Sequence, residues 1–461
     1  MIIERKIIMK VIKFGGSSLA DANQIKKVCD IILADDTRRL VVVSAPGKRF
    51  SGDEKVTDML IELATTALAD GDVSFCINKV VGRYESIARD LNLGDDIVNV
   101  IRDDITKRTN SIKTNPGKFI DLLKAAGEDN SAKLVAAYLC SIGVNAEYVN
   151  PRDAGLVLSD EFGNAQVLSK SYFKLARLAK RRTIMIFPGF FGYSETGEVV
   201  TFSRGGSDVT GGILAAAVNA DVYENFTDVD SVYAANPKLI ENPMPIPMFS
   251  YEEMRELSYA GFSVLHEEAL APVYHKGITV NIKNTNNPDA PGTLIVPSQA
   301  LTDEHKKMKV VGIAADKGFM TLHVQKYMMN REIGFGRRLL QIIEEENISY
   351  EHTPSGIDSI SIIINAKYYD DDVFDRIMKR IYSELDVDNV TIEFDQAIVM
   401  VVGHGMVNSV GTLALACQAL TDANINVNMI NQGSSEVSIM FGIDEVDADE
   451  ATKALYKAFF N

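Results

Sequence analysis

Short β-branched runs alternate with amphipathic helical segments from residue 10 to about residue 296, and this alternation limits the folds open to the chain. After a first strand that ends near Ile12, the runs predict strands at 40–44, 144–149, 183–187, 199–202, 221–226 and 278–282. The pattern is typical of an α/β fold with a mainly parallel sheet. Such sheets bind ligands at the carboxyl ends of their strands, so functional residues are expected there.

A lysine followed by two glycines lies at the first of these strand ends, in Lys13-Phe14-Gly15-Gly16-Ser17-Ser18. Residues 21–33 carry apolar side chains at helical spacing, which places the glycines at a strand-to-helix turn. Backbone N–H groups at such a turn can bind an anion. Because the lysine precedes the glycines, the P-loop pattern is excluded. Taken alone, the segment indicates either a phosphate site or a tight turn with a solvated lysine.

A second glycine turn, Ser203-Arg204-Gly205-Gly206-Ser207-Asp208, follows the predicted strand 199–202 and opens a helix that runs to about Asn219. The Arg204 guanidinium suits a carboxylate, and Ser207 is expected to cap the helix and present backbone donors to the same anion. Asp208 in a first helical turn is favoured by the helix dipole even without a further role.

Two more polar segments lie near predicted strands or helices. Gly127-Glu128-Asp129-Asn130 forms a predicted turn ahead of a helix, where an acidic residue indicates an ammonium site or an ordinary helix cap. The loop 227–238 follows the strand 221–226 and is suited to surround a nucleotide. Asp228 and Asp230 in that loop lack the glycine and terminal glutamate of a calcium loop, so calcium is discounted.

Length, charge and composition limit the kinds of partner that the chain is expected to bind. The 461 residues predict two to four domains, and a net charge of −16 argues against a nucleic-acid surface. We expect no membrane span, because no uninterrupted apolar run is long enough. The four cysteines, at 29, 76, 140 and 417, are expected to be buried thiols, and the six histidines show no metal-ligand spacing. With no signal-peptide pattern after Met1, and Met9 as an alternative start, these features predict a cytoplasmic protein without a protein-bound metal.

The chain changes character near residue 300. A turn-rich segment at 286–292 predicts a boundary between a catalytic domain, 1–298, and a second region, 299–461. In the second region three dipeptides recur at one offset of 77 residues: Ile333-Gly334 with Val410-Gly411, Asn347-Ile348 with Asn424-Ile425, and Ser361-Ile362 with Ser438-Ile439. The repeat predicts two copies of a strand, helix, strand, strand, helix module, at about 316–394 and 395–461.

Taken together, these motifs resemble those of one known family. The segments 13–18 and 203–208, with Thr57-Asp58, Gly127-Glu128, Thr227-Asp228 through Tyr233, and Tyr259-Ala260-Gly261 through His266, resemble the aspartate kinases of the amino-acid kinase family. The repeat resembles their C-terminal tandem ACT domains. The resemblance implies an amino-acid kinase-type α/β sandwich with a mainly parallel sheet, followed by two α+β, ferredoxin-like ACT modules.

The resemblance also implies a reaction and its residues. The γ-phosphoryl of ATP, carried with Mg²⁺, would pass to the β-carboxylate of L-aspartate and give 4-phospho-L-aspartate, the first step towards lysine, threonine and methionine. The implied catalytic residues are Lys13, Arg204 and Asp208; the implied aspartate contacts are Thr57, Glu128, Arg204 and Ser207; and the implied nucleotide contacts are Lys13, Gly15, Gly16, Ser18, Thr227, Asp228, Tyr233 and Lys238.

Regulation is implied as well, with an end-product amino acid bound at ACT modules that also join subunits into a homodimer or homotetramer. The predicted pocket walls are the loop 327–335 and a strand at 348–352, with Met329, Gly334, Phe335 and Glu351 as contacts. A carboxylate at Glu351 favours lysine over threonine as the inhibitor. Two alternatives stay open, namely a kinase for glutamate, an N-acetylated amino acid or a nucleotide, and an inactive ACT sensor.

Overall fold

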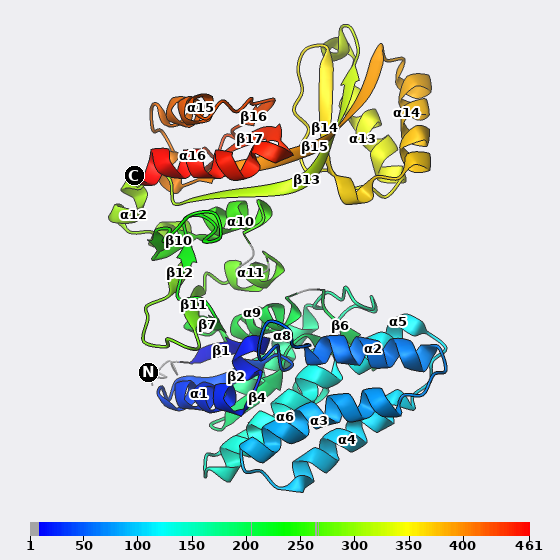
Figure 1. Ribbon diagram of the computed structural model, residues 1–461, viewed down its shortest axis with the longest axis vertical. Coiled ribbons are helices and arrows are strands. Elements are labelled where there is room, and N and C mark those ends of the chain that lie inside the picture. Colours follow the sequence, from blue (N-terminus) through cyan, green and yellow to red (C-terminus); the bar gives the residue numbers. More distant parts are fainter. Residues whose placement is uncertain (1–8, 204, 263–264, 266) are drawn as a thin grey trace, which may run out of the picture. The chain divides into compact units, whose positions relative to one another are not determined.

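The computed structural model describes residues 9–203, 205–262, 265 and 267–461, with the side chain of residue 267 left undescribed. The chain forms two compact units (Figure 1). The first contains the described residues of Met1–Val232, Ile246–Tyr251 and Ser263–Leu301, and the second contains those of Tyr233–Pro245, Glu252–Phe262 and Thr302–Asn461.

An eight-stranded sheet forms the centre of the first unit, in the order β10-β12-β11-β7-β1-β2-β4-β3. Its strands are β1 (Lys10–Phe14), β2 (Arg38–Val43), β3 (Ala146–Tyr148), β4 (Ile184–Pro188), β7 (Val222–Thr227), β10 (Met248–Ser250), β11 (Thr279–Asn284) and β12 (Thr293–Val296). All neighbours are parallel except β11 and β12. The prediction of a mainly parallel α/β sheet is therefore confirmed.

One predicted strand belongs elsewhere. The run 199–202 forms β6 (Val199–Thr201), which pairs antiparallel with β5 (Phe191–Tyr193) in a separate two-stranded sheet. The prediction that this run belongs to the parallel sheet was wrong, because β4 is followed at once by the β5–β6 hairpin. The turn of this hairpin includes Gly197 at a positive φ of 85°. Such hairpins need only local pairing, whereas a parallel neighbour needs a long crossover.

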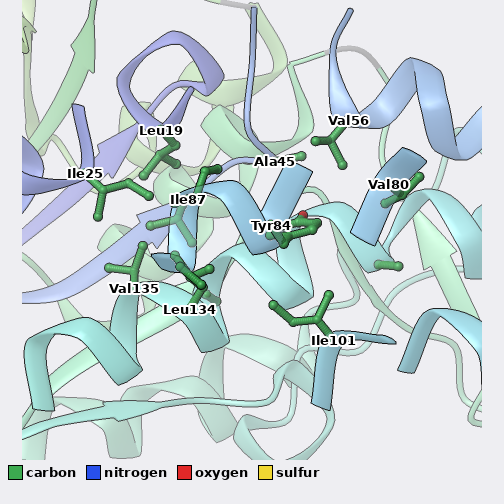
Figure 2. Close-up of a cluster of buried hydrophobic side chains, with 14 of the residues drawn as sticks. Leu19, Ile25, Ala45, Val56, Val80, Tyr84, Ile87, Ile101, Leu134 and Val135 are labelled. Atoms are coloured by element: carbon green, nitrogen blue, oxygen red, sulfur yellow. The ribbon is translucent and has the colours of Figure 1, made fainter. Parts of the chain in front are cut away.

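Helices enclose a large apolar core on one side of this sheet. They include α1 (Ala22–Leu33), α2 (Val56–Leu68), α3 (Ser74–Asp90), α4 (Asp95–Thr109), α5 (Pro116–Lys124) and α6 (Ala126–Ser141), while α7 (Pro151–Ala154), α8 (Lys170–Leu175), α9 (Gly206–Val218) and α11 (Glu267–Tyr274) lie further along the chain. Figure 2 shows part of the core, where Tyr84 lies among aliphatic side chains such as Ile101 and Leu134. Its buried hydroxyl donates to the Gly127 carbonyl oxygen at 2.7 Å, so burial leaves no unpaired hydroxyl.

The second unit is built on one antiparallel sheet, in the order β14-β13-β15-β17-β16. Its elements are α10 (Tyr251–Tyr259), α12 (Asp303–Lys307), β13 (Gly312–Gln325), α13 (Phe335–Glu345), β14 (Ser359–Asn365), α14 (Asp371–Leu385), β15 (Asn389–Val402), α15 (Thr412–Asp422), β16 (Met429–Asn431), β17 (Ser438–Asp444) and α16 (Ala448–Phe460). The predicted strand at 348–352 was wrong: only a bridge from His352 to Ile363 forms. Pro354 follows, and it lacks the N–H needed to extend a ladder.

The backbone shows the 77-residue repeat, although the first copy has only the bridge at His352 where the second copy has β16. Gly334 and Gly411 both take the left-handed conformation, with φ of 78° and 88°, directly before α13 and α15. Asn347 and Asn424 both have φ of 57° after those helices. Asparagine and glycine tolerate this conformation better than other residues, which explains why the repeat retains them.

Two further features of the sequence can be compared with the structure. All four cysteines are free, but only Cys29 and Cys76 are buried, since Cys140 is exposed and Cys417 is half-buried on its helix. Across the described part of the chain, no helix has both the length and the apolar character that a membrane crossing requires.

The two glycines near the start of α13 provide a matched test of backbone strain. A Cβ at Gly334 or at Gly336 would meet nothing within 4 Å, but only Gly334 has a positive φ. We expect Gly334→Ala to lower the free energy of unfolding by roughly 1 kcal/mol. Gly336→Ala should raise it by about 0.5 kcal/mol, because alanine favours the helix. Urea unfolding of the two variants checks this, and shifts of the same sign would contradict it.

Candidate active site

Lys13, at the end of β1, is a buried lysine held by polar partners from two other elements. Its side chain is nearly inaccessible, with the residue 7% exposed. The ammonium Nζ lies 2.5 Å from Oδ1 of Asp208 in α9, and 3.4 Å from Oδ1 of Asn225 in β7. Since a buried charge without a partner costs several kcal/mol, these contacts are what allow the lysine to lie there. The two glycine turns found in the sequence therefore meet at one point.

Asn225 is a member of this group that sequence analysis missed. It lies opposite Lys13 in the parallel ladder between β1 and β7, and it is 3% exposed. Its amide Nδ2 donates to Oδ1 of Asp208 at 2.8 Å. Asn225 thereby contacts both charged groups and fixes the carboxylate relative to the ammonium. The available signal was a polar side chain in the middle of a strand buried on both faces, where apolar residues are usual.

Gly16 and Gly47 bring the ends of β1 and β2 into backbone contact. The Gly47 N–H donates to the Gly16 carbonyl oxygen at 2.8 Å. A Cβ on Gly16 would lie 2.9 Å from the Ala45 oxygen, and one on Gly47 would lie 2.6 Å from the Gly16 carbonyl carbon. Neither position has space for a side chain. Gly47, also missed, is further held by Arg83, whose Nη2 donates to its carbonyl oxygen at 2.5 Å.

Gly15 and Ser18, the other predicted members of the first turn, differ in their surroundings. Gly15 lies close to the lysine, because a Cβ there would be 3.6 Å from Lys13 Nζ. The Ser18 hydroxyl is buried, 2.7 Å from the Thr285 hydroxyl beyond β11, so it already has a partner within the fold.

Glu128 is a buried carboxylate with an unused oxygen. It lies in the first turn of α6 and not in a loop ahead of the helix, as the sequence had suggested. Gly127 is not a turn residue here. It lets α6 pack closely against Ala45, because a Cβ at Gly127 would be 2.8 Å from the Ala45 Cβ. Glu128 is 5% exposed, and its Oε2 has no hydrogen-bond partner among the described residues. Burial raises the pKa of Glu128 to about 7, although the Ala45 N–H donates to the carboxylate.

The next residue, Asp129, has a different environment. Its Oδ2 lies 2.5 Å from Arg108 Nη2 and 2.9 Å from Lys133 Nζ, and its Oδ1 accepts from the Tyr148 hydroxyl. Neither Asp129 nor Asn130 caps the helix, as one interpretation of the sequence had it, because both lie inside α6. Asp129 is thus saturated by partners within the fold.

The second glycine turn positions α9. Its N-cap is Gly205, at a φ of 75°, so the prediction that Ser207 caps this helix was wrong. Ser207 instead lies against the turn after β4, since a Cβ on Gly189 would be 2.6 Å from the Ser207 hydroxyl oxygen. In that turn Phe190 has a φ of 73°, which is uncommon for a bulky residue. Arg204, Ser207's predicted partner at the carboxylate, lies outside the described residues, as does His266.

The remaining predicted contacts lie in several places. Thr57 is the half-buried second residue of α2, and Thr227 ends β7 with its hydroxyl 3.2 Å from the exposed Asp228 carboxylate. Tyr233 and Lys238 belong to the second unit. Their roles at the nucleotide stay predictions.

The predicted regulatory residues differ in exposure. Met329 and Phe335 lie in the apolar core of the second unit, while Gly334 is exposed at the start of α13. Glu351 is half-buried and accepts a hydrogen bond from the Tyr259 hydroxyl at 2.7 Å. Burial and this carboxylate raise the pKa of Tyr259, so the phenol stays a donor.

Comparison with known proteins places this geometry in a family. Residues 9–284 match the model of the amino acid kinase family, and residues 399–459 match an ACT domain. Aspartokinase 3 of Bacillus subtilis is 54% identical, over 98% of this chain and 99% of its own. The crystal structure of Clostridium acetobutylicum aspartate kinase is similar with a TM-score of 0.85 and 39% identity, covering 98% of this chain and 100% of that one. Escherichia coli aspartokinase III in complex with lysine and aspartate gives a TM-score of 0.73 at 25% identity, with coverage of 98% and 100%.

Substitution of Asn225 tests the contact between the two charged groups. We expect Asn225→Leu to lower turnover by about tenfold, because it removes one hydrogen bond from the Asp208 carboxylate and leaves Lys13 with a single close partner. Tyr223→Phe is the matched control, since Tyr223 lies on the same strand but donates to the Asp208 backbone oxygen, at 3.1 Å. Steady-state kinetics should show a lower kcat for the first variant only. Equal losses in both would mean that α9 packing, and not the carboxylate's position, is what matters.

Proposed function

The chain belongs to the amino acid kinase family, among its aspartate kinases, and we propose that Glu128, Lys13 and Asp208 are central to its reaction. An aspartate kinase transfers a phosphoryl group from ATP to aspartate. The observation that supports these roles is the buried Glu128 carboxylate with a free oxygen, which suits the α-ammonium of a free amino acid. An N-acetylated substrate has no such ammonium, so this feature favours a free amino acid.

The nucleophile of this reaction needs no general base. The β-carboxylate of aspartate has a pKa near 3.9 and is ionised at neutral pH. Catalysis then depends on bringing two anions together and on stabilising the charge that develops on the transferred group. In our proposal the positive charge of the Lys13 ammonium provides that stabilisation, and Asp208 with Asn225 hold the ammonium in place. Gly15 and Gly16 let the phosphates approach the backbone beside it.

The aspartate side of the site is assigned by position and by resemblance. Arg204 is proposed to bind the α-carboxylate, with Thr57 and Ser207 positioning the substrate, and Ser18, Thr227, Asp228, Tyr233 and Lys238 are proposed for the nucleotide. Mg²⁺ would accompany ATP and neutralise its phosphates. The described residues hold no group of three or more His, Cys, Asp or Glu side chains suited to a metal. In our proposal the ion is held mainly by the phosphates and by water, which needs no cluster of protein ligands.

The pH dependence of aspartate use tests the role of Glu128. Only the ionised carboxylate attracts an ammonium, and burial raises its pKa to about 7. At saturating ATP, kcat/KM for aspartate should therefore fall about tenfold for each pH unit below 7. Glu128→Gln should lower kcat/KM and flatten this profile. Trapping the acyl phosphate with hydroxylamine measures the rate.

Two comparisons sharpen this experiment. Succinate, which lacks the ammonium, should be used equally poorly by the wild type and by Glu128→Gln. Because the variant removes a buried charge, it should also unfold at a higher temperature at pH 8. If Glu128→Gln kept the wild-type pH profile, the proposed ammonium site would be wrong.

We further propose that the ACT region binds lysine and that lysine inhibits the enzyme, with threonine as the alternative ligand. Burial raises the pKa of the Asp316 carboxyl, and the negative charge of the half-buried Glu351 carboxylate raises it further. Two carboxylates that repel one another favour a cation near them. The aspartokinase III of Escherichia coli was crystallised with lysine, which supports the same ligand here. The product would then serve lysine, threonine and methionine biosynthesis.

Assembly through the ACT modules is proposed on similar grounds. Ile333 and Val410, which occupy equivalent places in the repeat, are 99% and 95% exposed. Large aliphatic side chains at such positions favour contact with another subunit, as a homodimer or homotetramer.

Lysine inhibition should depend on Glu351 more than on its hydrogen-bond donor. We expect Glu351→Gln to raise the lysine concentration for half-inhibition by tenfold or more, since it removes the charge that pairs with the side-chain ammonium. Tyr259→Phe keeps that charge and should change the concentration by less than threefold. Activity measured against lysine concentration separates the two. Wild-type activity that is unaffected by saturating lysine would contradict the proposal.

A further inference from the structure

A run of positive charge lies outside the site described so far. Between residues 170 and 182 the chain has six Lys or Arg residues and no Asp or Glu, namely Lys170, Lys174, Arg177, Lys180, Arg181 and Arg182. The whole chain carries 63 acidic against 47 basic residues. A segment of one sign that opposes the net charge needs a reason, because like charges side by side destabilise the fold that holds them.

Part of this run lines a cavity in the first unit. The cavity has a volume of about 420 Å³ and lies between α7 and the segment from α8 to Arg181. Four of its lining residues are cationic: Arg152, Lys174, Arg177 and Arg181. Asp153 is the single carboxylate residue among those that line it. This volume is within the range of sites for small molecules.

The fold leaves the charge of this cavity largely uncompensated. Lys174 and Arg177 have no ion-pair or hydrogen-bond partner in the part of the chain that the structure describes. The Arg152 guanidinium stacks on the Tyr193 ring, 4.3 Å from its centroid, and donates to a backbone oxygen, so no carboxylate neutralises it. Among the described residues, Arg181 is the one cation of the four with a carboxylate partner, its Nη1 lying 3.3 Å from the Glu147 carboxylate.

Packing also fixes where two of these cations project. Gly155 has a φ of 90°, and a Cβ there would lie 2.6 Å from the Lys174 Cβ. The absence of a side chain at Gly155 therefore lets the Lys174 stem pack across the end of α7. The stacking of Arg152 on Tyr193 has a similar effect, because a planar guanidinium on a ring loses little further freedom when it binds an anion.

The cavity is separate from the active site. Arg152 follows β3 and Arg181 precedes β4, at the edge of the sheet order β1-β2-β4-β3. Strands are spaced about 4.8 Å apart, so β3 lies roughly 14 Å from β1 and its lysine. None of the cavity's residues has a role in the reaction described above.

We propose that this cavity binds a small anion that carries two or more phosphate or carboxylate groups. Guanidinium groups pair with either oxyanion in a bidentate manner, and three of them with one ammonium match more than one negative charge. The net charge of −16 disfavours a nucleic acid, and a cavity of about 420 Å³ suits a small molecule. The inference goes beyond the aspartate kinase reaction and does not depend on it.

Calorimetric titration of the full chain tests the site, with ADP present to occupy the active site. The probes are citrate and inorganic pyrophosphate, and whichever binds more tightly identifies carboxylate or phosphate as the preferred group. Arg177→Glu and Lys174→Glu should each weaken binding by about tenfold or more, as expected for a lost charge-assisted hydrogen bond. Binding should also weaken as salt is raised.

Lys180→Glu is the matched control, because it changes net charge equally on the same run but Lys180 does not line the cavity. It should change affinity by less than threefold. All three side chains are exposed, so the variants are expected to fold, which equal thermal midpoints would verify. The proposal is overturned if neither probe binds at millimolar concentration. It is equally overturned if Lys180→Glu weakens binding as much as Arg177→Glu, since that would indicate diffuse attraction to the whole run.

Discussion

The pairing of the buried Lys13 ammonium with Asp208 and Asn225 is the interaction on which the candidate active site depends. A lysine at this depth is tolerated only because Asp208 and Asn225 lie against it, and they come from α9 and β7. The β1–β7 register that places Lys13 opposite Asn225 is therefore under a strict constraint. A slip by one residue would turn the asparagine to the other face of the sheet and leave the ammonium with one close partner fewer.

Glycines determine how closely the surrounding segments approach this lysine. The contact between Gly16 and Gly47 joins the ends of β1 and β2 backbone to backbone, and Gly127 brings α6 against Ala45 in the same region. The second of these contacts carries Glu128 to the strand ends, where the Ala45 N–H reaches its carboxylate. The small side chain at Gly127 thus sets the position of the Glu128 carboxylate, which lies in a helix and not in a loop.

The sequence predicted well those features that depend on local periodicity. The parallel sheet, the position of α9 and the 77-residue repeat follow from the spacing of apolar residues and from glycine or asparagine at fixed offsets. It predicted poorly what depends on which backbone segments meet. Gly127 was interpreted as part of a turn, although it lies in a helix, and Ser207 as a cap, although Gly205 has that place. Asn225 and Gly47 were missed because their partners lie far away in the sequence.

In the second unit, the two copies of the repeat are joined in one sheet. β13 and β15 are 14 residues each and pair with one another along most of their length, so the two halves of the repeat share a single sheet. Residues 359–365 of β14 pair with β13, and the Glu351 N–H donates to Ile363 of β14 at 2.8 Å. The ligand proposed to bind the Glu351 carboxylate would therefore contact a segment that is hydrogen-bonded directly to the sheet. Because β13 pairs with both β14 and β15, a shift of β14 would act on a strand that the two halves of the repeat share.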